Sequence, residues 1–143
     1  MKKFIYLLFV SILALGLFAG CGKASGSTSY KDGTYTGKSG QDDKGAYGEA
    51  SVTIIENKIT DCKYVTRQSD GSIKDEEYGK VNGEISNRDY YDKAQLAVKA
   101  MQQYAQELVK VQKLEEVDAV SGATIAHDQF TEAVKDALAQ AKK

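Results

Sequence analysis

The stretch EASVTII at residues 49–55 alternates apolar and polar side chains, and this alternation decides the fold class of the chain. One face of the stretch is apolar and the other is polar: Ala50, Val52 and Ile54 against Ser51 and Thr53. A period of two residues is typical of a strand with one buried face. The stretch therefore predicts a half-buried strand in an antiparallel sheet.

A second strand is expected from Ile59 to Thr66, with Cys62 and Tyr64 on one face. Asn57-Lys58 is a plausible two-residue turn between the strands, because Asn tolerates positive φ. The two strands then form a β-hairpin. Before it, glycines bound a short extended segment, Thr34-Tyr35-Thr36, and residues 42–45 read as a polar loop. Residues 68–87 are polar and turn-rich, and they are compatible with either a short strand or a ligand-facing loop.

The second half of the chain is helical. Apolar residues at steps of three and four predict a helix of about 25 residues, capped by Asn87 or Asp89. Its stripe is Tyr91, Ala94, Val98, Met101, Ala105, Leu108 and Val111. A C-terminal helix carries a second stripe, formed by Phe130, Ala133, Val134, Ala137, Leu138 and Ala141. A small antiparallel sheet packed by a long helix and a C-terminal helix is an α+β fold.

The first 20 residues read as an export signal, because the basic start Met1-Lys2-Lys3 precedes an uncharged apolar run. The run from Phe4 to Ala19 is shorter than the roughly 20 residues of a spanning helix. Leu17-Phe18-Ala19-Gly20-Cys21 resembles the bacterial lipobox, in which the cysteine is lipidated and becomes the mature N-terminus. An ordinary secretory signal with a chance cysteine is the alternative. Residues 21–29 are rich in Gly and Ser, and we expect a flexible tether between lipidated Cys21 and a domain at 30–143.

Composition narrows the functional classes. The formal net charge is −1 and the chain has no basic stripe, so we expect no nucleic-acid partner. The chain has only two cysteines. If Cys21 carries a lipid, Cys62 has no intrachain partner and is expected to be a small buried residue on a strand. An intermolecular disulfide is the less favoured alternative.

The segment between the two helices, VDAVSGATI at residues 117–125, carries the chemistry. Ser121, Gly122 and Ala123 are small and allow close approach to the backbone. Thr124 is expected at the N-cap of the second helix, where free amides and the positive end of the helix dipole suit a phosphate. Read alone, the same residues also fit a simple capped turn between helices.

The pattern Asp118-x-x-Ser121-Gly122-Ala123-Thr124 resembles the flavinylation motif of the FMN-binding domain family. That family includes covalent-flavin subunits of sodium-pumping NADH:quinone reductase and small lipoproteins of Gram-positive bacteria. The resemblance implies that a flavin transferase joins FMN to Thr124 through a phosphoester, with Asp118, Ser121, Gly122 and Ala123 as the recognised surroundings. Many members have a second hydroxyl residue two places later, where this chain has Ala126.

The resemblance extends over most of the chain after Tyr30. Residues 32–37 are similar to the family's opening strand, and residues 47–61 are similar to its hairpin, although the turn lacks the usual glycine. Relatives in the large complexes have a Glu-Thr-Pro-Gly-type flavin-contacting loop. Its counterpart here would be Glu76-Glu77-Tyr78-Gly79, which departs from that pattern.

The resemblance implies a lipid-anchored flavoprotein on the outer face of the cell membrane. It would shuttle electrons between a membrane redox system and external acceptors, as a carrier rather than a self-contained enzyme. A non-redox lipoprotein that binds a ligand or partner at the surface is the alternative. A signalling role of the cleaved signal segment is a third possibility that the sequence does not test.

The remaining ionisable residues give no competing site. His127 is the single histidine, and we expect an exposed helical residue rather than a contact to phosphate or flavin. Without a second His or a Cys pair, no zinc site is expected. Asp118 can assist a divalent ion during flavin transfer, whereas Glu115 and Glu116 are expected to be solvated. Ser121 has no His–acid pair in its sequence context, which argues against a hydrolase triad.

Overall fold

The computed structural model describes residues 28–143. The predicted signal peptide at 1–20, the lipidation of Cys21 and most of the tether lie outside the described residues. Within residues 28–143, no helix is long and apolar enough to cross a membrane.

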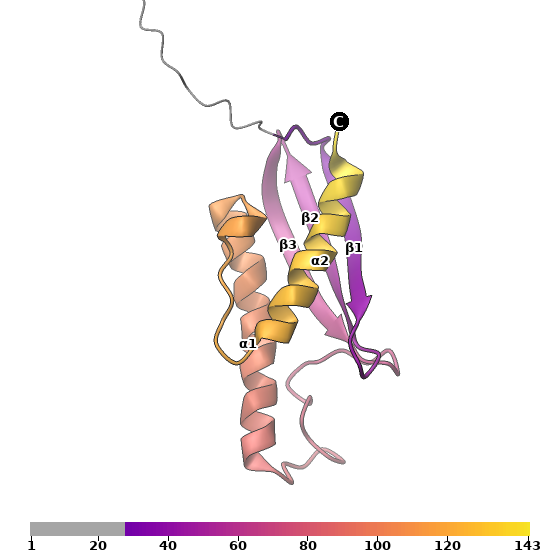
Figure 1. Ribbon diagram of the computed structural model, residues 1–143, viewed down its shortest axis with the longest axis vertical. Coiled ribbons are helices and arrows are strands. Elements are labelled where there is room, and N and C mark those ends of the chain that lie inside the picture. Colours follow the sequence, from indigo (N-terminus) through magenta and orange to yellow (C-terminus); the bar gives the residue numbers. More distant parts are fainter. Residues whose placement is uncertain (1–27) are drawn as a thin grey trace, which may run out of the picture.

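Three antiparallel strands form one sheet in the order β1-β2-β3 (Figure 1). They are β1 (Gly33–Gln41), β2 (Tyr47–Ile55) and β3 (Lys58–Arg67), so the predicted hairpin is confirmed. The first strand is longer than the expected segment Thr34-Tyr35-Thr36, because it pairs with β2 from Gly33 to Lys38. Pairing to a neighbouring strand here overrides the weak strand propensity of glycine.

The hairpin turn lies one residue earlier than predicted. Its central residues are Glu56 and Asn57, with φ of 52° and 62°, and Lys58 already pairs with Ile55. A two-residue turn with both central residues at positive φ matches the right-handed twist of the flanking strands. Asn57 is therefore the second central residue of the turn, and the prediction of Asn57-Lys58 is wrong by one position.

A bulge at the start of β3 changes which side chains face the core. Ile59 pairs with Ile54 and Asp61 pairs with Thr53, which leaves Thr60 as an extra residue. Ile59 and Cys62 are three residues apart, yet both are buried, because the extra residue reverses the alternation. Cys62 is a free buried thiol as predicted, and burial raises the pKa of the thiol to about 12.

Both helices are confirmed, with small shifts in their caps and faces. Helix α1 (Arg88–Val111) begins after Asn87, whose side chain accepts a hydrogen bond from the amide of Tyr90 at 3.0 Å. A short 3-10 turn, η1 (Leu114–Glu116), precedes α2 (Thr124–Ala141). Tyr104 is absent from the predicted stripe of α1 but is only 1% exposed. Its hydroxyl group also contacts the backbone of Val120 and Ala123 in the loop before α2.

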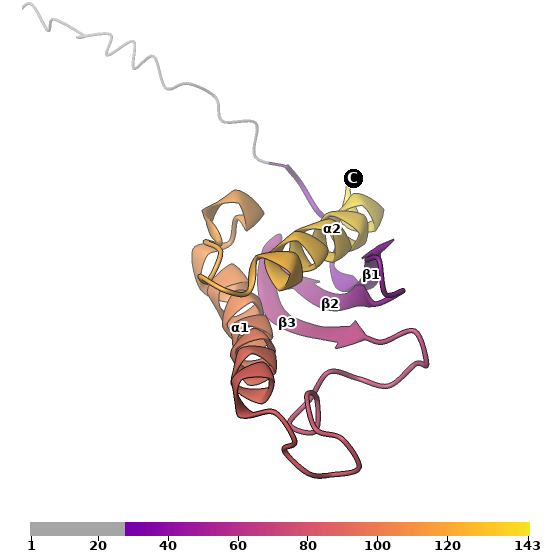
Figure 2. The same ribbon diagram turned by 60° about the horizontal axis from the view of Figure 1, so that its bottom comes forward.

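The helices cover the sheet as predicted for an α+β fold. Helix α2 packs on β1 and β2, and α1 packs on β3 (Figures 1 and 2). The layer between them is filled by aromatic and branched side chains. The Phe130 ring lies 5.1 Å from that of Tyr64 in an edge-to-face arrangement and 5.6 Å from that of Tyr104. Such contacts stabilise the core beyond the area they bury.

The approach of α2 to β1 is close enough to require a glycine. A Cβ at Gly37 would lie 2.1 Å from the carbonyl oxygen of Ala133 and 2.3 Å from the amide nitrogen of Ala137. Both neighbours are backbone atoms and both alanines are fully buried, so neither can move aside without shifting the helix. Gly37 therefore sets the distance between α2 and the sheet.

Gly37→Ala is expected to lower the free energy of unfolding by about 3 kcal/mol or more, because overpacking against fixed backbone cannot relax by side-chain rotation. Gly40→Ala on the same strand is the matched control, since its Cβ would lie 3.5 Å from the Glu132 carboxylate. Urea unfolding followed by circular dichroism measures both variants. Equal midpoints for the two variants would contradict this account of the helix–sheet contact.

Candidate functional site

The loop that contains the predicted motif is held by one buried hydroxyl. Tyr104 Oη donates to the carbonyl oxygen of Ala123 at 3.2 Å and accepts from the amide of Val120 at 2.9 Å. The amide of Ala123 also donates to the carbonyl of Val120 at 2.9 Å, which closes a turn. Residues 120–123 are thereby fixed against α1, directly before α2 begins.

His127 fixes the other end of this loop. Its Nε2 lies 2.8 Å from the carbonyl oxygen of Val117, and its ring packs edge-on against Tyr104 at 5.2 Å. The side chain is 21% exposed, so the expectation of an exposed helical residue is wrong. The reason is that the loop folds back over the first turn of α2 and covers the ring.

Gly122 gives the loop its sharp turn. Its φ of 84° is in the left-handed region that glycine adopts without strain. A Cβ there would lie 3.0 Å from Cδ2 of Leu96 on α1, so the backbone approaches that helix closely. The glycine is required here by the approach of α1, and the expected approach of a bulky group to this backbone stays a prediction.

Thr124 is the first residue of α2, and Ala123 occupies the N-cap without a side-chain cap. The predicted N-cap position at Thr124 is therefore one residue too late, and Thr124 is the first residue of the helix itself. The first intrahelical bond is made by the amide of His127 to Ala123, so the amides of residues 124–126 precede it. Because the first turn has no acidic residue, these amides and the positive helix end suit a phosphate.

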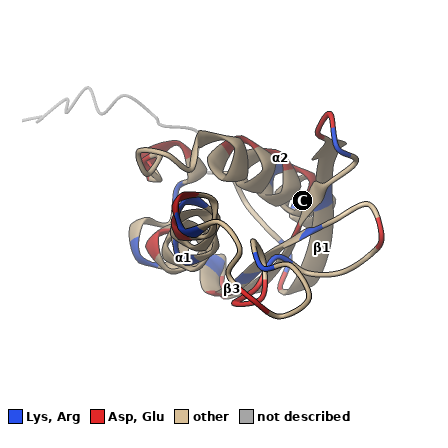
Figure 3. Ribbon diagram, turned by 90° about the horizontal axis from the view of Figure 1, so that it is seen from below, with Lys and Arg blue, Asp and Glu red and all other residues tan. Residues whose placement is uncertain are grey.

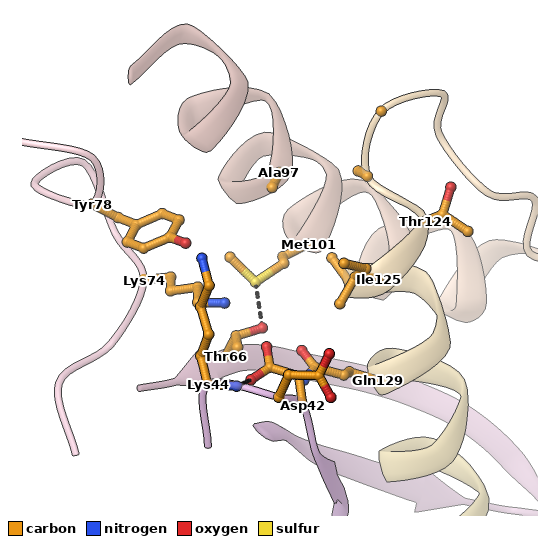
Figure 4. Close-up of a pocket in the computed structure, with 14 residues that line it drawn as sticks. Asp42, Lys44, Thr66, Lys74, Tyr78, Ala97, Met101, Thr124, Ile125 and Gln129 are labelled. Atoms are coloured by element: carbon orange, nitrogen blue, oxygen red, sulfur yellow. Dashed lines mark hydrogen bonds between the residues drawn. The ribbon is translucent and has the colours of Figure 1, made fainter. Parts of the chain in front are cut away.

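A cleft of about 450 Å³ opens beside the start of α2 and is called the main cleft below (Figure 4). Its volume lies within the range of about 300–1,000 Å³ that is usual for small-molecule sites. Three loops, the end of β3 and both helices contribute to it. Residues in its lining include Asp42, Lys44, Thr66, Lys74, Tyr78, Ala97, Met101, Thr124, Ile125 and Gln129.

The floor of the main cleft is fixed by hydrogen bonds. Gln129 is 6% exposed and donates from Nε2 to the carbonyl of Ala46 at 2.9 Å. Thr66 is 1% exposed, and its hydroxyl lies 3.0 Å from Sδ of Met101. The cleft therefore has an ordered floor and an apolar wall along α1.

The structure brings together part of the predicted site. Gly122, Ala123 and Thr124 line the main cleft, and Thr124 is exposed at its rim. Asp118 lines a separate hollow with Tyr104 and Glu116, and exposed Ser121 is not among the residues that line the main cleft.

The segment at 68–87 is a loop with isolated bridges rather than a strand, and it forms one wall of the main cleft. Lys74 and Tyr78 come from it, and Lys74 Nζ lies 5.1 Å from the centre of the Tyr78 ring. Burial and the neighbouring Tyr90 raise the pKa of Tyr78 to about 12, so this phenol is neutral at physiological pH. Lys74 and Tyr78 lie among many polar turn residues in the sequence, so no local pattern distinguished them from their neighbours.

Charge around the main cleft is mixed. Asp42 and Asp43 stand with Lys44 on the turn between β1 and β2, while Lys74 comes from the opposite loop. Figure 3 shows basic and acidic positions interspersed over the strands, helices and loops. Within residues 28–143, no group of three or more His, Cys, Asp or Glu is placed to hold a metal ion.

These features define a class of protein. It is a two-layer α+β domain with a partly apolar cleft, and the rim of that cleft suits a phosphate. The model of the FMN-binding domain matches residues 45–139, and the chain belongs to this family. It is therefore a flavin-binding protein whose cofactor is FMN.

A solved structure has the same fold. The crystal structure of the CPE2226 protein from Clostridium perfringens aligns with a TM-score of 0.61 and 24% sequence identity, covering 78% of this chain and 88% of that one. No curated protein sequence matches the chain.

Tyr104→Phe is expected to lower the free energy of unfolding by about 1–3 kcal/mol, because the buried amide of Val120 loses its acceptor. Amide hydrogen exchange at Val120 should accelerate more than exchange in the centre of α1. Tyr47→Phe on β2 is the matched control, because that half-buried ring lies outside the loop. Unchanged exchange at Val120 would show that the hydroxyl does not hold the loop.

Proposed function

We propose that the chain carries one FMN joined to Thr124 by a phosphoester and acts as an electron carrier. The observation that carries this proposal is the position of Thr124, an exposed hydroxyl at the rim of the main cleft and in the first turn of α2. Free amides there would hold the phosphate, and the adjoining cleft would take the flavin ring. The bound flavin supplies the electron-transfer chemistry, and the protein supplies position and electrostatics.

The residues of the cleft fit this group. Gly122 and Ala123, directly before Thr124, are small residues in the lining of the cleft. The walls offer Ala97, Met101 and Ile125 to an apolar ring, and the polar floor offers Gln129. FMN is a planar aromatic ring with a phosphate at the far end of its side chain. The ring would lie against the apolar wall, and the phosphate would lie at the open end of the helix.

Attachment requires a separate flavin transferase and an activated donor. In the balanced reaction, the Thr124 hydroxyl loses its proton and an Oγ1–P bond forms. The diphosphate bond of a flavin dinucleotide breaks at the same phosphorus, and the donor's other mononucleotide leaves. Asp118 and Ser121 would be recognised by the transferase rather than by the ring, since neither lines the main cleft.

Thr124→Ala is expected to abolish covalent flavin when the chain is co-expressed with the transferase. Mass spectrometry of the peptide containing Thr124 should show one added FMN less one water in the unaltered chain. Thr60→Ala, at the exposed bulge of β3, is the matched control and should keep full attachment. An unmodified Thr124 peptide in protein from the native host would refute the ester and leave flavin binding without a covalent link.

The second part of the proposal places the protein on the outer face of the cell membrane, anchored by lipid on Cys21. It rests on the resemblance of residues 17–21 to the lipobox, and the spacing of the two ends of α2 is compatible with it. Tyr30 bridges to Lys142 and the amide of Lys31 bonds to the carbonyl of Ala141, so the chain enters the domain at the end of α2. Thr124 lies at the other end of that helix. An 18-residue helix that rises about 1.5 Å per residue separates its two ends by about 27 Å. The cleft would then be remote from the anchor and open to donors and acceptors.

Cys21→Ala is expected to move the protein from the membrane fraction to the medium, because the lipid chains supply about 0.8 kcal/mol per buried methylene. Cell fractionation and immunoblotting measure the distribution. Cys62→Ala is the control, since that thiol is buried in the domain and should not affect anchoring. Retention of Cys21→Ala in the membrane would contradict lipid anchoring.

A further inference from the structure

Two lysines from different loops point into the same end of the main cleft. Lys44 belongs to the turn between β1 and β2, and Lys74 belongs to the loop after β3 (Figure 4). Each is fixed at its root, because the amide of Lys44 donates to the Asp42 carboxylate at 2.9 Å and the amide of Lys74 donates to the carbonyl of Thr66 at 2.9 Å. The backbone at both lysines is therefore ordered, with the Lys74 side chain partly buried and the Lys44 side chain exposed.

Lys74 is partly buried without an ion-pair partner. Among residues 28–143, no carboxylate lies within 4.0 Å of its Nζ, which stands 5.1 Å from the centre of the Tyr78 ring. Burial lowers the pKa of Lys74, Lys44 lowers it further, and Asp42 and Tyr90 oppose this effect. A desolvated cation beside a second cation favours an anionic ligand, because an anion restores the lost solvation and offsets the repulsion.

The end of the cleft that holds the two lysines also holds Asp42 and Asp43, and it differs from the phosphate seat. Thr124 and the first amides of α2 lie on one side of the cleft, and the lysines rise from the two loops on another (Figure 4). A single phosphate held at Thr124 therefore leaves the lysine pair for another electronegative group. In FMN, the remaining electronegative group of suitable size is the pyrimidine part of the ring.

We propose that Lys44 and Lys74 contact the ring of the bound flavin and favour its reduced, negatively charged form. This inference rests on the proposed function, in which the main cleft holds FMN. Transfer of two electrons and one proton from the membrane donor leaves one negative charge on the ring. The positive charges of the two lysines, against the opposing charges of Asp42 and Asp43, would stabilise that state relative to the neutral oxidised ring and so raise the reduction potential.

The first measurement is the midpoint potential of the full flavinylated chain. Lys74→Met and Lys44→Met should each lower the ratio of reduced to oxidised flavin about tenfold at a given applied potential, a shift of about 30 mV for a two-electron couple. Lys74→Arg should restore most of the potential, because it keeps the charge. Lys63→Met, on the exposed face of β3, is the matched control and should leave the potential unchanged. Equal potentials in all four variants would overturn the proposal.

The second measurement uses the full chain produced without the transferase. The binding of free riboflavin and of free FMN is measured by anaerobic equilibrium dialysis, before and after reduction of the flavin with dithionite. Lys74→Met should weaken the binding of reduced riboflavin more than the binding of oxidised riboflavin. The loss of affinity should be similar for FMN. A loss confined to FMN would place the phosphate at the lysines and overturn the proposal.

The two proposals fail in different ways. A Thr124 peptide without FMN refutes the ester, and the riboflavin dialysis still tests the lysines because riboflavin has no phosphate. An intact ester with an unchanged potential in Lys44→Met and Lys74→Met refutes the lysine proposal alone. Absence of binding by both free flavins to the unaltered chain refutes it as well.

Discussion

The close contact between α2 and β1 is the constraint on which the site depends. Gly37 brings the sheet against the backbone of Ala133 and Ala137, with no side chain between them. Such a contact admits one separation and one register, because backbone atoms cannot adopt another rotamer. The helix is thereby fixed along its length, and its first turn stands beside the end of β3. The phosphate seat at Thr124 is thus set by packing at the opposite half of the same helix.

The loop before α2 connects that packing to the geometry of the cleft. Tyr104 belongs to the core, and its hydroxyl holds both Val120 and Ala123. One side chain therefore stabilises the hydrophobic layer and orients the backbone at the cleft. His127 completes the arrangement by bonding to Val117 rather than by facing the cleft. The consequence is a cleft whose helix side is held by core side chains, whereas its opposite wall is a loop held by hydrogen-bonded turns and isolated bridges.

Periodicity and local chemistry predicted the fold class, the hairpin and both helices. They also predicted the burial of Ala50, Val52 and Ile54. Tertiary contacts decide two of the errors, the length of β1 and the burial of His127, whereas the hairpin turn and the N-cap of α2 are each displaced by one residue. At the site, the motif residues Gly122 to Thr124 could be recognised from the sequence. Small residues directly before a helix form a local pattern that does not depend on the rest of the fold. Lys44 and Lys74 were not, since they lie in polar loops 30 residues apart and meet only through the sheet.

An open cleft and a covalent link suit each other under the proposed function. The main cleft is shallow enough that Thr124 and Ile125 remain exposed at its rim, with Ile125 66% exposed. A site of this kind cannot bury most of a ligand, so reversible binding alone would lose the flavin to a dilute exterior. An ester removes that requirement, because the attached ring meets the cleft at an effective concentration near the millimolar range. The cleft then needs only to orient the ring and tune its charge, while the exposed edge stays available for electron exchange with partners.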